Sequence, residues 1–352
     1  MASIINSTNS TAPNMAQSGK LSSDEVISFI LGTCIAGTGF FINLTVILMI
    51  LIQDKVKTVS DGLILHLTFC DLIAATITAI YALAVLANNV IGLPYKFSDG
   101  ICKSLSFILP MFYVLTVATL TLISVERYRA IIHPMKPRIS GKKVLIILLP
   151  VWLVTIAIAI GYMSETSADA LNASYCILKD NKRRIMIFIS LIYLILFGYI
   201  IPLIIMLYCY TKIIAKLKFI FSITASHVIQ ESYSQIQKKR VIKTSIAVSI
   251  IFMFTGIPFV IAIVINIYTA SRTTNLTNLE INIGGVFSSI GIVLLLLAPM
   301  YNPVIYFVKK INNCSLSCNY KAQVIPNGIK DKTGTHNVRV IMIKNTNNAL
   351  IT

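Results

Sequence analysis

The sequence has few charged residues. Of its 352 residues only 12% are Asp, Glu, Lys or Arg, whereas 56% are hydrophobic and the mean hydropathy is +0.81. A soluble domain carries about 25% charged residues, so this composition excludes an ordinary water-soluble globular domain. The apolar residues come in long runs, which indicates an all-α protein with several membrane-spanning helices.

Acidic residues are scarcer than basic ones. The chain has 13 Asp and Glu against 30 Lys and Arg, and its formal net charge is +17. Such an excess could attract nucleic acid, but the location of the basic residues argues against that partner. Most of them fall in segments on one side of the predicted spans, a bias typical of cytoplasmic loops. We therefore attribute the excess to membrane topology and to anionic membrane lipid, and expect no nucleic-acid partner.

Seven apolar spans are predicted, at 26–52, 60–87, 101–132, 144–163, 186–218, 239–268 and 280–307. An odd number of spans places the two ends of the bundle 26–307 on opposite sides of the membrane. Residues 1–25 lack a basic-then-apolar signal peptide and carry glycosylation sequons at Asn6 and Asn9, so we expect an extracellular tail. The second and third outer loops carry further sequons, which begin at Asn172 and Asn275.

The region beyond the seventh span is polar and basic. Residues 308–318 are predicted to form a short amphipathic helix on the membrane surface, and 319–352 to form a disordered cytoplasmic tail. Cys314 and Cys318 are candidate palmitoylation sites, and the alternative is two unmodified thiols. The chain has no internal repeat, which disfavours many transporter folds.

The third predicted span carries the most informative motif. Cys102 stands at one end, and Glu126, Arg127 and Tyr128 stand at the other, just before Pro134. At about 1.5 Å per residue the roughly 25 residues between them cover roughly 37 Å, enough to cross a bilayer. A thiol suits an oxidising exterior, whereas the charged triplet suits the cytoplasmic interface. Polar residues and prolines recur in the other spans, at Asn43, Asp71, Trp152, Pro202, Tyr210, Pro258 and the run Asn302-Pro303-Val-Ile-Tyr306.

Together these motifs resemble the rhodopsin-like (class A) G-protein-coupled receptors, in every span. The resemblance implies a seven-transmembrane-helix bundle and a receptor, not an enzyme. In the family the arginine of the triplet pairs with the adjacent acid at rest and swings toward the fifth and seventh helices on activation. The opened cavity then accepts the G protein. The coupling and activation residues implied here are Glu126, Arg127, Tyr128, Pro134, Tyr210, Asn302, Pro303 and Tyr306.

The resemblance also implies an interior polar network, in which the family holds water and a sodium ion. The matching residues are Asn43, Asp71, Thr116 and Asn302. Ala298 and Pro299, however, stand where the family's sodium site usually has hydroxyl or amide side chains. We therefore expect sodium to bind weakly or not at all, and we expect no other metal and no cofactor.

Two further sets of residues follow from the resemblance. Cys102 is expected to form a disulfide with Cys176 in the second outer loop. A core packing switch is expected at Val117, Pro202, Phe252, Gly256 and Pro258. Gly256 departs from the family, which has a tryptophan there that floors the ligand pocket. Either another aromatic residue, Phe254 or Phe259, fills that space, or the pocket is deeper. Pro202 is expected to allow a local bulge.

The ligand is constrained mainly by what is missing. Amine receptors carry an aspartate where this chain has Leu109, and opsins carry a retinal-binding lysine where it has Leu296. A protonated monoamine is therefore disfavoured and covalent retinal is excluded. The predicted pocket, with Leu109, Tyr113, Phe259 and Leu296, is compatible with a peptide or a lipid.

The sequence therefore predicts a plasma-membrane receptor that passes an extracellular signal to a heterotrimeric G protein, with arrestin as a further candidate partner. Two alternatives stay open. One is a constitutively active or non-coupling receptor of the same family, which the glycine at 256 favours. The other is a secondary transporter or channel with Asp71 and Asn302 on its ion path, which ion flux dependent on Asp71 would reveal.

Overall fold

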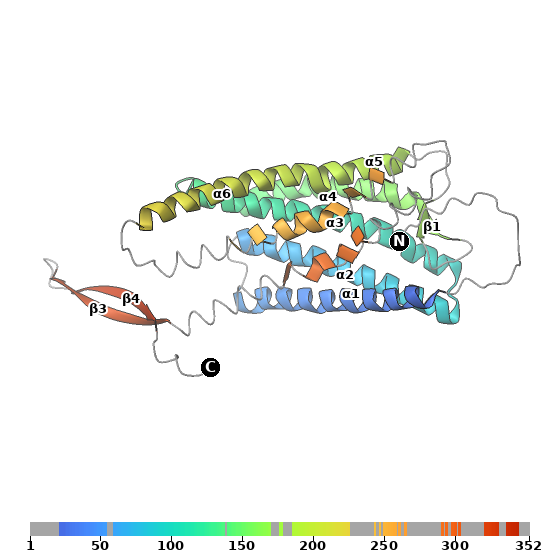
Figure 1. Cartoon of the computed structure of the whole chain (residues 1–352), viewed down its shortest axis with the longest axis horizontal. Coiled ribbons are helices and arrows are strands. Elements are labelled where there is room, and N and C mark those ends of the chain that lie inside the picture. Colours follow the sequence, from blue (N-terminus) through green and yellow to red (C-terminus); the bar gives the residue numbers. More distant parts are fainter. Residues whose placement is uncertain are drawn as a thin grey trace, which may run out of the picture.

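The computed structural model describes residues 21–54, 59–137, 139–169, 176–178, 185–225, 320–330 and 336–344, together with separate positions between 243 and 303. Figure 1 shows long helices lying side by side in one bundle. The helices are α1 (Ser23–Met49), which continues as the π-helix η1 (Ile50–Asp54), then α2 (Val59–Ile91), α3 (Tyr95–Ile132) and α4 (Gly141–Ser164). The fifth span consists of α5 (Ile185–Ile195), the π-helix η2 (Leu196–Ile200) and α6 (Ile201–Ala225).

Five of the predicted spans are helices long and apolar enough to cross a membrane: Ser23–Ile52, Val59–Ile91, Tyr95–Ile132, Gly141–Ser164 and Ile185–Leu217. The sixth span is described as a shorter apolar helix, Ser249–Pro258, and the seventh at helical positions that include 297–300. The helices extend beyond the predicted apolar limits. The third begins at Tyr95 and not at 101, because its first turns are polar and hydropathy marks the membrane and not the helix end.

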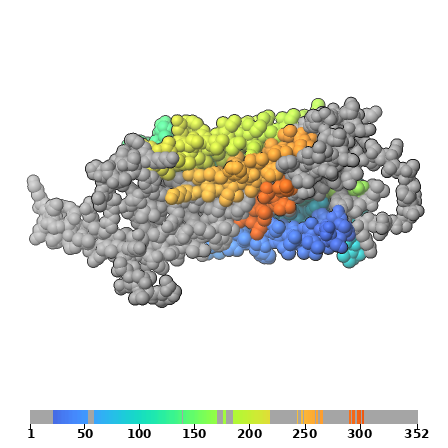
Figure 2. All heavy atoms as spheres, viewed as in Figure 1, coloured from blue at the N-terminus to red at the C-terminus, as the bar shows by residue number. Residues whose placement is uncertain are grey.

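Helix α3 is the axis of the bundle. In its most apolar window 61% of the residues are buried, against 22% in α1 and 17% in α4. Its neighbours pack a core around its second half, formed by Leu63, Leu67, Val117, Leu120, Ile123, Leu148, Met206, Tyr210, Ile213, Phe252 and Met253. Large apolar side chains such as Phe41 and Ile146 point outward, as a lipid-facing surface requires. Figure 2 shows α1 and α6 at opposite edges of one face, with described parts of the last two spans between them.

Several helix ends follow from local sequence. Ser22 caps α1 in a capping box with Glu25, and the Ser140 side chain accepts a hydrogen bond from the backbone of the first turn of α4. Helix α2 ends at Ile91, and Gly92 follows with a φ of 68°, in the left-handed region that glycine adopts without strain. Pro94 follows and directly precedes α3. These signals fix the turn between α2 and α3.

Two short antiparallel sheets accompany the helices. The strands β1 (Thr166–Ala168) and β2 (Cys176–Leu178) pair beside the first turns of α3. The strands β3 (Tyr320–Lys330) and β4 (His336–Lys344) pair with each other in the tail. The second pair differs from the disordered tail predicted for 319–352. Its backbone register pairs β-branched residues, which favour strands, as at Val324 and Val340.

Candidate functional site

A buried polar network crosses the middle of the bundle. The side-chain amide of Asn302 in the seventh span donates to Oδ2 of Asp71 in α2 at 2.9 Å. The hydroxyl of Thr116 in α3 donates to the other carboxylate oxygen of Asp71 at 3.3 Å. All three side chains are at most 5% exposed. The predicted residues are therefore brought together, and Asp71 joins three helices.

Asn43 extends this network to α1. Its side-chain amide donates to the carbonyl oxygen of Gly39 at 2.8 Å and to that of Pro299 at 2.7 Å. The second bond connects α1 to the seventh span, so Asn43 fixes the separation of these two helices. The side-chain oxygens of Asn43 and Asn302 are buried and have no hydrogen-bond partner within the described parts of the chain.

The residues around Asp71 offer few oxygen atoms to a sodium ion. A hard cation needs several oxygen ligands. Here both oxygens of Asp71 already accept hydrogen bonds, and Ala298 and Pro299 offer no side-chain oxygen. Within the described residues of this network, only the side-chain oxygens of Asn43 and Asn302 are buried and free to act as further ligands, and the amide of Asn43 is bonded to two backbone carbonyls and not to Asp71. This donor set is too small for tight binding, and weak or absent sodium binding stays our prediction.

The Glu-Arg-Tyr triplet lies in the last two turns of α3. Nε of Arg127 is 3.3 Å from a carboxylate oxygen of Glu126, and its Nη2 donates to the hydroxyl of Ser60 in α2 at 3.2 Å. Both members of the ion pair are mostly shielded, with side chains 21% and 14% exposed. Arg127 is thus held to its own helix and to α2. Pro134 follows the C-cap residue His133 and ends the helix.

Two tyrosines connect this end of the bundle to the fifth span. The ring of Tyr128 contacts the ring of Tyr208, with 5.7 Å between centroids. Tyr210 lies on the opposite, buried side of α6, and its hydroxyl is 2.8 Å from that of Ser249 in the sixth span. Tyr210 of the fifth span is therefore joined to the sixth span, whereas Arg127 belongs to the third.

Gly256 lies against an aromatic ring of the fifth span. A Cβ atom at this position would be 3.0 Å from Cε2 of Tyr199 and 3.5 Å from the hydroxyl of Tyr113. The ring of Tyr113 stacks on Phe252, with centroids 5.6 Å apart. Phe254 is 68% exposed and points away. Of the two aromatic residues given as alternatives for this space, Phe254 does not lie in it and Phe259 lies outside the described residues, whereas the Tyr199 ring lies directly beside Gly256. Pro202 is the second residue of α6, just after the bulge η2 that was expected near this proline.

Trp152 of α4 anchors a second polar cluster. Its indole Nε1 donates to Nε2 of His66 in α2 at 3.0 Å, and Nδ1 of His66 is 2.8 Å from the hydroxyl of Thr119 in α3. An indole nitrogen can only donate. Nε2 of His66 is therefore the acceptor, and the ring proton lies on Nδ1, directed at Thr119. This cluster holds α2, α3 and α4 together.

The opposite end of the bundle is closed by the expected disulfide. Cys102 and Cys176 are bonded, with Cα atoms 5.5 Å apart, which confirms that prediction. The Asp99 carboxylate accepts from the backbone nitrogen of Ala168 in β1 at 3.1 Å and forms an ion pair with Lys103 at 2.6 Å. The hydroxyl of Tyr95 donates to the Ala168 carbonyl at 3.2 Å. The β1–β2 hairpin is therefore attached to α3 at two places.

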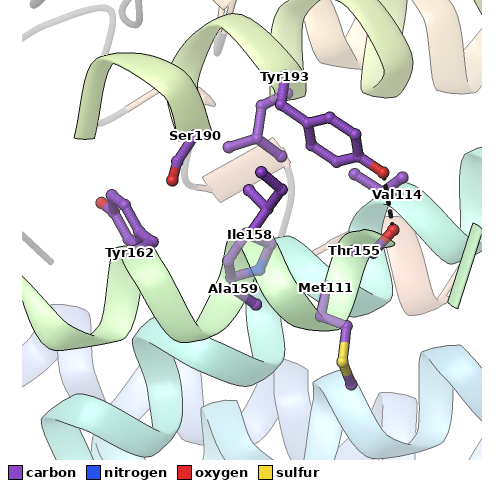
Figure 3. Close-up of a pocket in the computed structure, with 10 residues that line it drawn as sticks. Met111, Val114, Thr155, Ile158, Ala159, Tyr162, Ser190 and Tyr193 are labelled. Atoms are coloured by element: carbon purple, nitrogen blue, oxygen red, sulfur yellow. Dashed lines mark hydrogen bonds between the residues drawn. The ribbon is translucent and has the colours of Figure 1, made fainter. Parts of the chain in front are cut away.

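Two of the four predicted pocket residues, Leu109 and Tyr113, lie within the described residues. Leu109 packs against the apolar cluster around Tyr81 and Leu105, and Tyr113 packs on Phe252. A narrow crevice lies between α3, α4 and α5, and neither of these two residues lines it. Figure 3 shows its walls, from Met111 and Thr155 to Ser190, with the Thr155 and Tyr193 hydroxyls joined at 2.9 Å.

Several predicted positions lie outside the described residues. They are Phe259, Leu296, Tyr306, Cys314, Cys318, Asn6, Asn9, Asn172 and Asn275, together with the amphipathic helix expected at 308–318.

Sequence reasoning missed five contact residues: Ser60, His66, Asp99, Tyr199 and Ser249. Two of them carried a signal. A histidine within an apolar span is costly unless it is bonded, and Asp99 stands four residues before Lys103, a spacing that favours an ion pair. The other three depend on which helix faces which, and this requires the packed bundle.

Comparison with known proteins connects this geometry to a family. The family model described as 7 transmembrane receptor (rhodopsin family) matches residues 42–306. The chain is 26% identical over 291 residues to the G-protein coupled receptor homolog Q2/3L of Sheeppox virus (strain KS-1), covering 78% of this chain and 69% of that one. It is 27% identical to the Substance-K receptor of Canis lupus familiaris, covering 62% and 56%, and 25% identical to the C-X-C chemokine receptor type 2 of Mus musculus, covering 66% and 60%. The chain thus spans little more than half of the length of the Substance-K receptor.

A solved structure supports the fold independently. Squid rhodopsin matches with a TM-score of 0.64 over 85% of this chain and 84% of its own, at 18% identity. Since the identity is low, this likeness shows the fold alone. It agrees with the family match, and the predicted seven-transmembrane-helix fold and multi-pass membrane character are confirmed. The chain belongs to the rhodopsin family of seven-transmembrane receptors, and it is a receptor and not an enzyme.

Proposed function

We propose that this receptor activates a heterotrimeric G protein at the end of the bundle where Arg127 lies, in response to a peptide or small protein that arrives at the disulfide end. The observation that carries this proposal is the double restraint on Arg127. Its guanidinium contacts Glu126 at 3.3 Å and Ser60 at 3.2 Å, and both contacts can be exchanged for others without unfolding any helix.

The restraint on Arg127 distinguishes two states of the receptor, one with Arg127 held and one with Arg127 released. In the described state the guanidinium lies along α3 and α2, and the fifth and sixth spans are joined by the Tyr210–Ser249 bond at 2.8 Å. If the sixth span moves outward, that bond breaks and Arg127 gains room to leave Ser60. A ligand that binds the second state better than the first shifts the population toward it. The exposed cavity is then the surface that a G protein would enter.

The ligand class rests on two supports. Leu109 lies in an apolar cluster with Leu105 and Tyr81, which offers a protonated amine no anionic partner at that position. Relatives named for substance K and for C-X-C chemokines are among the matches. A peptide or small protein can use the hairpin surface around Asp99 and Lys103, so it does not depend on a deep cavity.

Orientation follows from the same proposal. We place the disulfide end outside the cell and the Arg127 end in the cytoplasm, with the basic loops against anionic lipid. Arrestin would approach the same cytoplasmic end as the G protein. The Cys314 and Cys318 thiols, if acylated, would attach the following segment to the membrane.

The proposal is tested by nucleotide exchange on a panel of purified G proteins, in membranes that hold the full chain. Wild-type membranes should accelerate exchange over empty membranes, and Arg127→Ala at equal surface expression should not. Lys142→Ala removes an exposed positive charge from the start of α4 and is the matched control, expected to behave as wild type. No exchange above empty membranes with any G protein, including in the presence of a peptide library, would contradict coupling.

A second candidate within the family is a receptor that signals without a diffusible ligand. Gly256 favours it, because the position that a tryptophan occupies in the family carries no side chain here. High basal exchange from the wild type, unchanged by peptides, would select this candidate. Basal exchange that rises with a peptide would select the ligand-regulated receptor.

A further inference from the structure

We propose that Tyr199 is the positioning residue that holds the sixth span against the fifth, in the space that Gly256 leaves open. We call the two residues a ring-and-slot pair: the fifth span provides the Tyr199 ring, and Gly256 of the sixth span, which has no side chain, leaves the space for it. This inference deepens the proposed function, because the movement of the sixth span is what coupling would use.

The fit between ring and slot is close. A Cβ atom built on Gly256 would be 3.0 Å from Cε2 and 3.3 Å from Cδ2 of Tyr199. Carbon atoms in contact prefer about 3.5–4.0 Å, so even alanine would require the ring or the helix to move. The ring therefore already occupies the position of any larger side chain at 256.

A hydrogen bond fixes the ring from its other end. The Tyr199 hydroxyl donates to the carbonyl oxygen of Met253 at 3.1 Å. Met253 lies one helical turn before Gly256, so both the edge and the tip of the ring contact the same stretch of the sixth span. An outward movement of this stretch must break the hydrogen bond and remove the ring from its slot together.

The π-helix explains how Tyr199 reaches this place. Tyr199 lies within η2, whose wider turn changes the direction of its side chains relative to α5 and α6. A second glycine in the same turn, Gly198, admits the neighbouring ring, since a Cβ there would be 3.1 Å from Cε1 of Tyr113. Tyr113 in turn stacks on Phe252, the residue before Met253, so the rings of α3, η2 and the sixth span interlock.

The test measures the position of the sixth span directly and needs no G protein. Spin labels are placed at Lys142→Cys and Lys243→Cys, both exposed at the Arg127 end, in the purified full chain with Cys34, Cys314 and Cys318 replaced by serine. Double electron–electron resonance then gives the distance between α4 and the sixth span. The wild-type background should give a short, narrow distribution. Tyr199→Ala should lengthen and broaden it, and Tyr199→Phe, which keeps the ring and loses the hydroxyl, should give an intermediate shift.

The decisive comparison combines a larger side chain at position 256 with a smaller one at position 199. Gly256→Trp alone should lengthen the distance, because the indole and the Tyr199 ring compete for one space. Combining Gly256→Trp with Tyr199→Ala should return the distribution toward wild type. Tyr193→Ala removes another aromatic ring of the same span, one that bonds to Thr155, and should leave the distance unchanged.

Two results would overturn the inference. One is an unchanged distance in both Tyr199 variants, and the other is a double variant whose shift equals the sum of the two single shifts. Nucleotide exchange with the same variants is measured separately. A wild type without exchange but with the predicted distances would refute coupling and leave the ring-and-slot pair intact.

Discussion

The side-chain amide of Asn302 donates a 2.9 Å hydrogen bond to Oδ2 of Asp71, and both residues are buried in the middle of the bundle. This bond joins the second and seventh spans. At the same depth Thr116 connects the third span to Asp71. Because Asn302 begins the Asn-Pro-x-x-Tyr run, the bond also fixes where that run lies. The network is thus a structural link between the helix that carries Asp71 and the helix that ends at the proposed coupling surface.

Removing the carboxylate should weaken the bundle measurably. Asp71→Ala leaves the Asn302 amide and the Thr116 hydroxyl without their acceptor, and hydrogen bonds of this kind between membrane helices contribute about 0.6–2 kcal/mol. We expect a lower midpoint of thermal unfolding in detergent, measured by a thiol-reactive or fluorescence assay. Asp24→Asn, in the exposed first turn of α1, is the control and should unfold as wild type does. An unaltered midpoint for Asp71→Ala would show that the network carries no stability.

The His66–Trp152 bond should be detected as a coupling energy. Trp152→Phe removes the only donor to Nε2 of His66 among the described residues, and His66→Phe removes the acceptor. Each single change should destabilise the protein by about 1 kcal/mol, and the double change by less than the sum, because both remove the same bond. Thermal unfolding of the four proteins gives the cycle. Strict additivity would mean that the two side chains do not interact.

The disulfide should stabilise the attachment of the β1–β2 hairpin to α3. Cys176→Ser frees the β1–β2 hairpin from Cys102 and should cost about 2–4 kcal/mol of stability. Cys102→Ser and the double replacement should lose the same amount, because each breaks one shared bond. Cys34, an exposed free cysteine of α1, supplies the control as Cys34→Ser. Surface expression and unfolding midpoints report the result, and a wild-type midpoint for Cys176→Ser would contradict the prediction.

Glycosylation tests the orientation of the chain. With the first residues outside the cell, Asn6 and Asn9 should carry glycans in cells that N-glycosylate. Peptide N-glycosidase should then increase the electrophoretic mobility of the wild type. The combined Asn6→Gln and Asn9→Gln replacement should reduce that shift, and adding Asn172→Gln and Asn275→Gln should abolish it. A wild type that the glycosidase leaves unchanged would count against the proposed topology.

The sequence predicts the fold well because membrane helices are long, apolar and separated by polar turns. The resemblance to the family located Asn43, Asp71, Thr116 and Asn302, and the structure places them in one buried network, as polar side chains within a bilayer require. The ends of the helices were harder to predict from the sequence, because polar turns such as the one that starts at Tyr95 continue a helix out of the membrane. The β3–β4 pair was missed because pairing is set by a partner strand that composition does not reveal.

The space beside Gly256 shows why the rest could not be predicted. The glycine itself signals an unusual position, but the ring that meets it comes from Tyr199, in a different span. Which of several aromatic residues enters the space depends on the π-helix η2, which turns Tyr199 toward the sixth span. Ser60, the partner of Arg127, is hidden for the same reason, because a serine in α2 carries no signal until α2 and α3 pack.

The most direct test of the account is basal nucleotide exchange by three proteins at equal surface expression: wild type, Ser60→Ala and Arg127→Ala. Ser60→Ala removes the 3.2 Å hydrogen bond that holds Arg127 to α2. A bond of about 1 kcal/mol corresponds to about a fivefold change in the balance between the two states. We therefore expect exchange to rise up to about that factor in Ser60→Ala and to fall to the level of empty membranes in Arg127→Ala, with the double variant equally silent. Exchange that is the same in all three proteins would contradict the role of Arg127 and, with it, the proposed coupling.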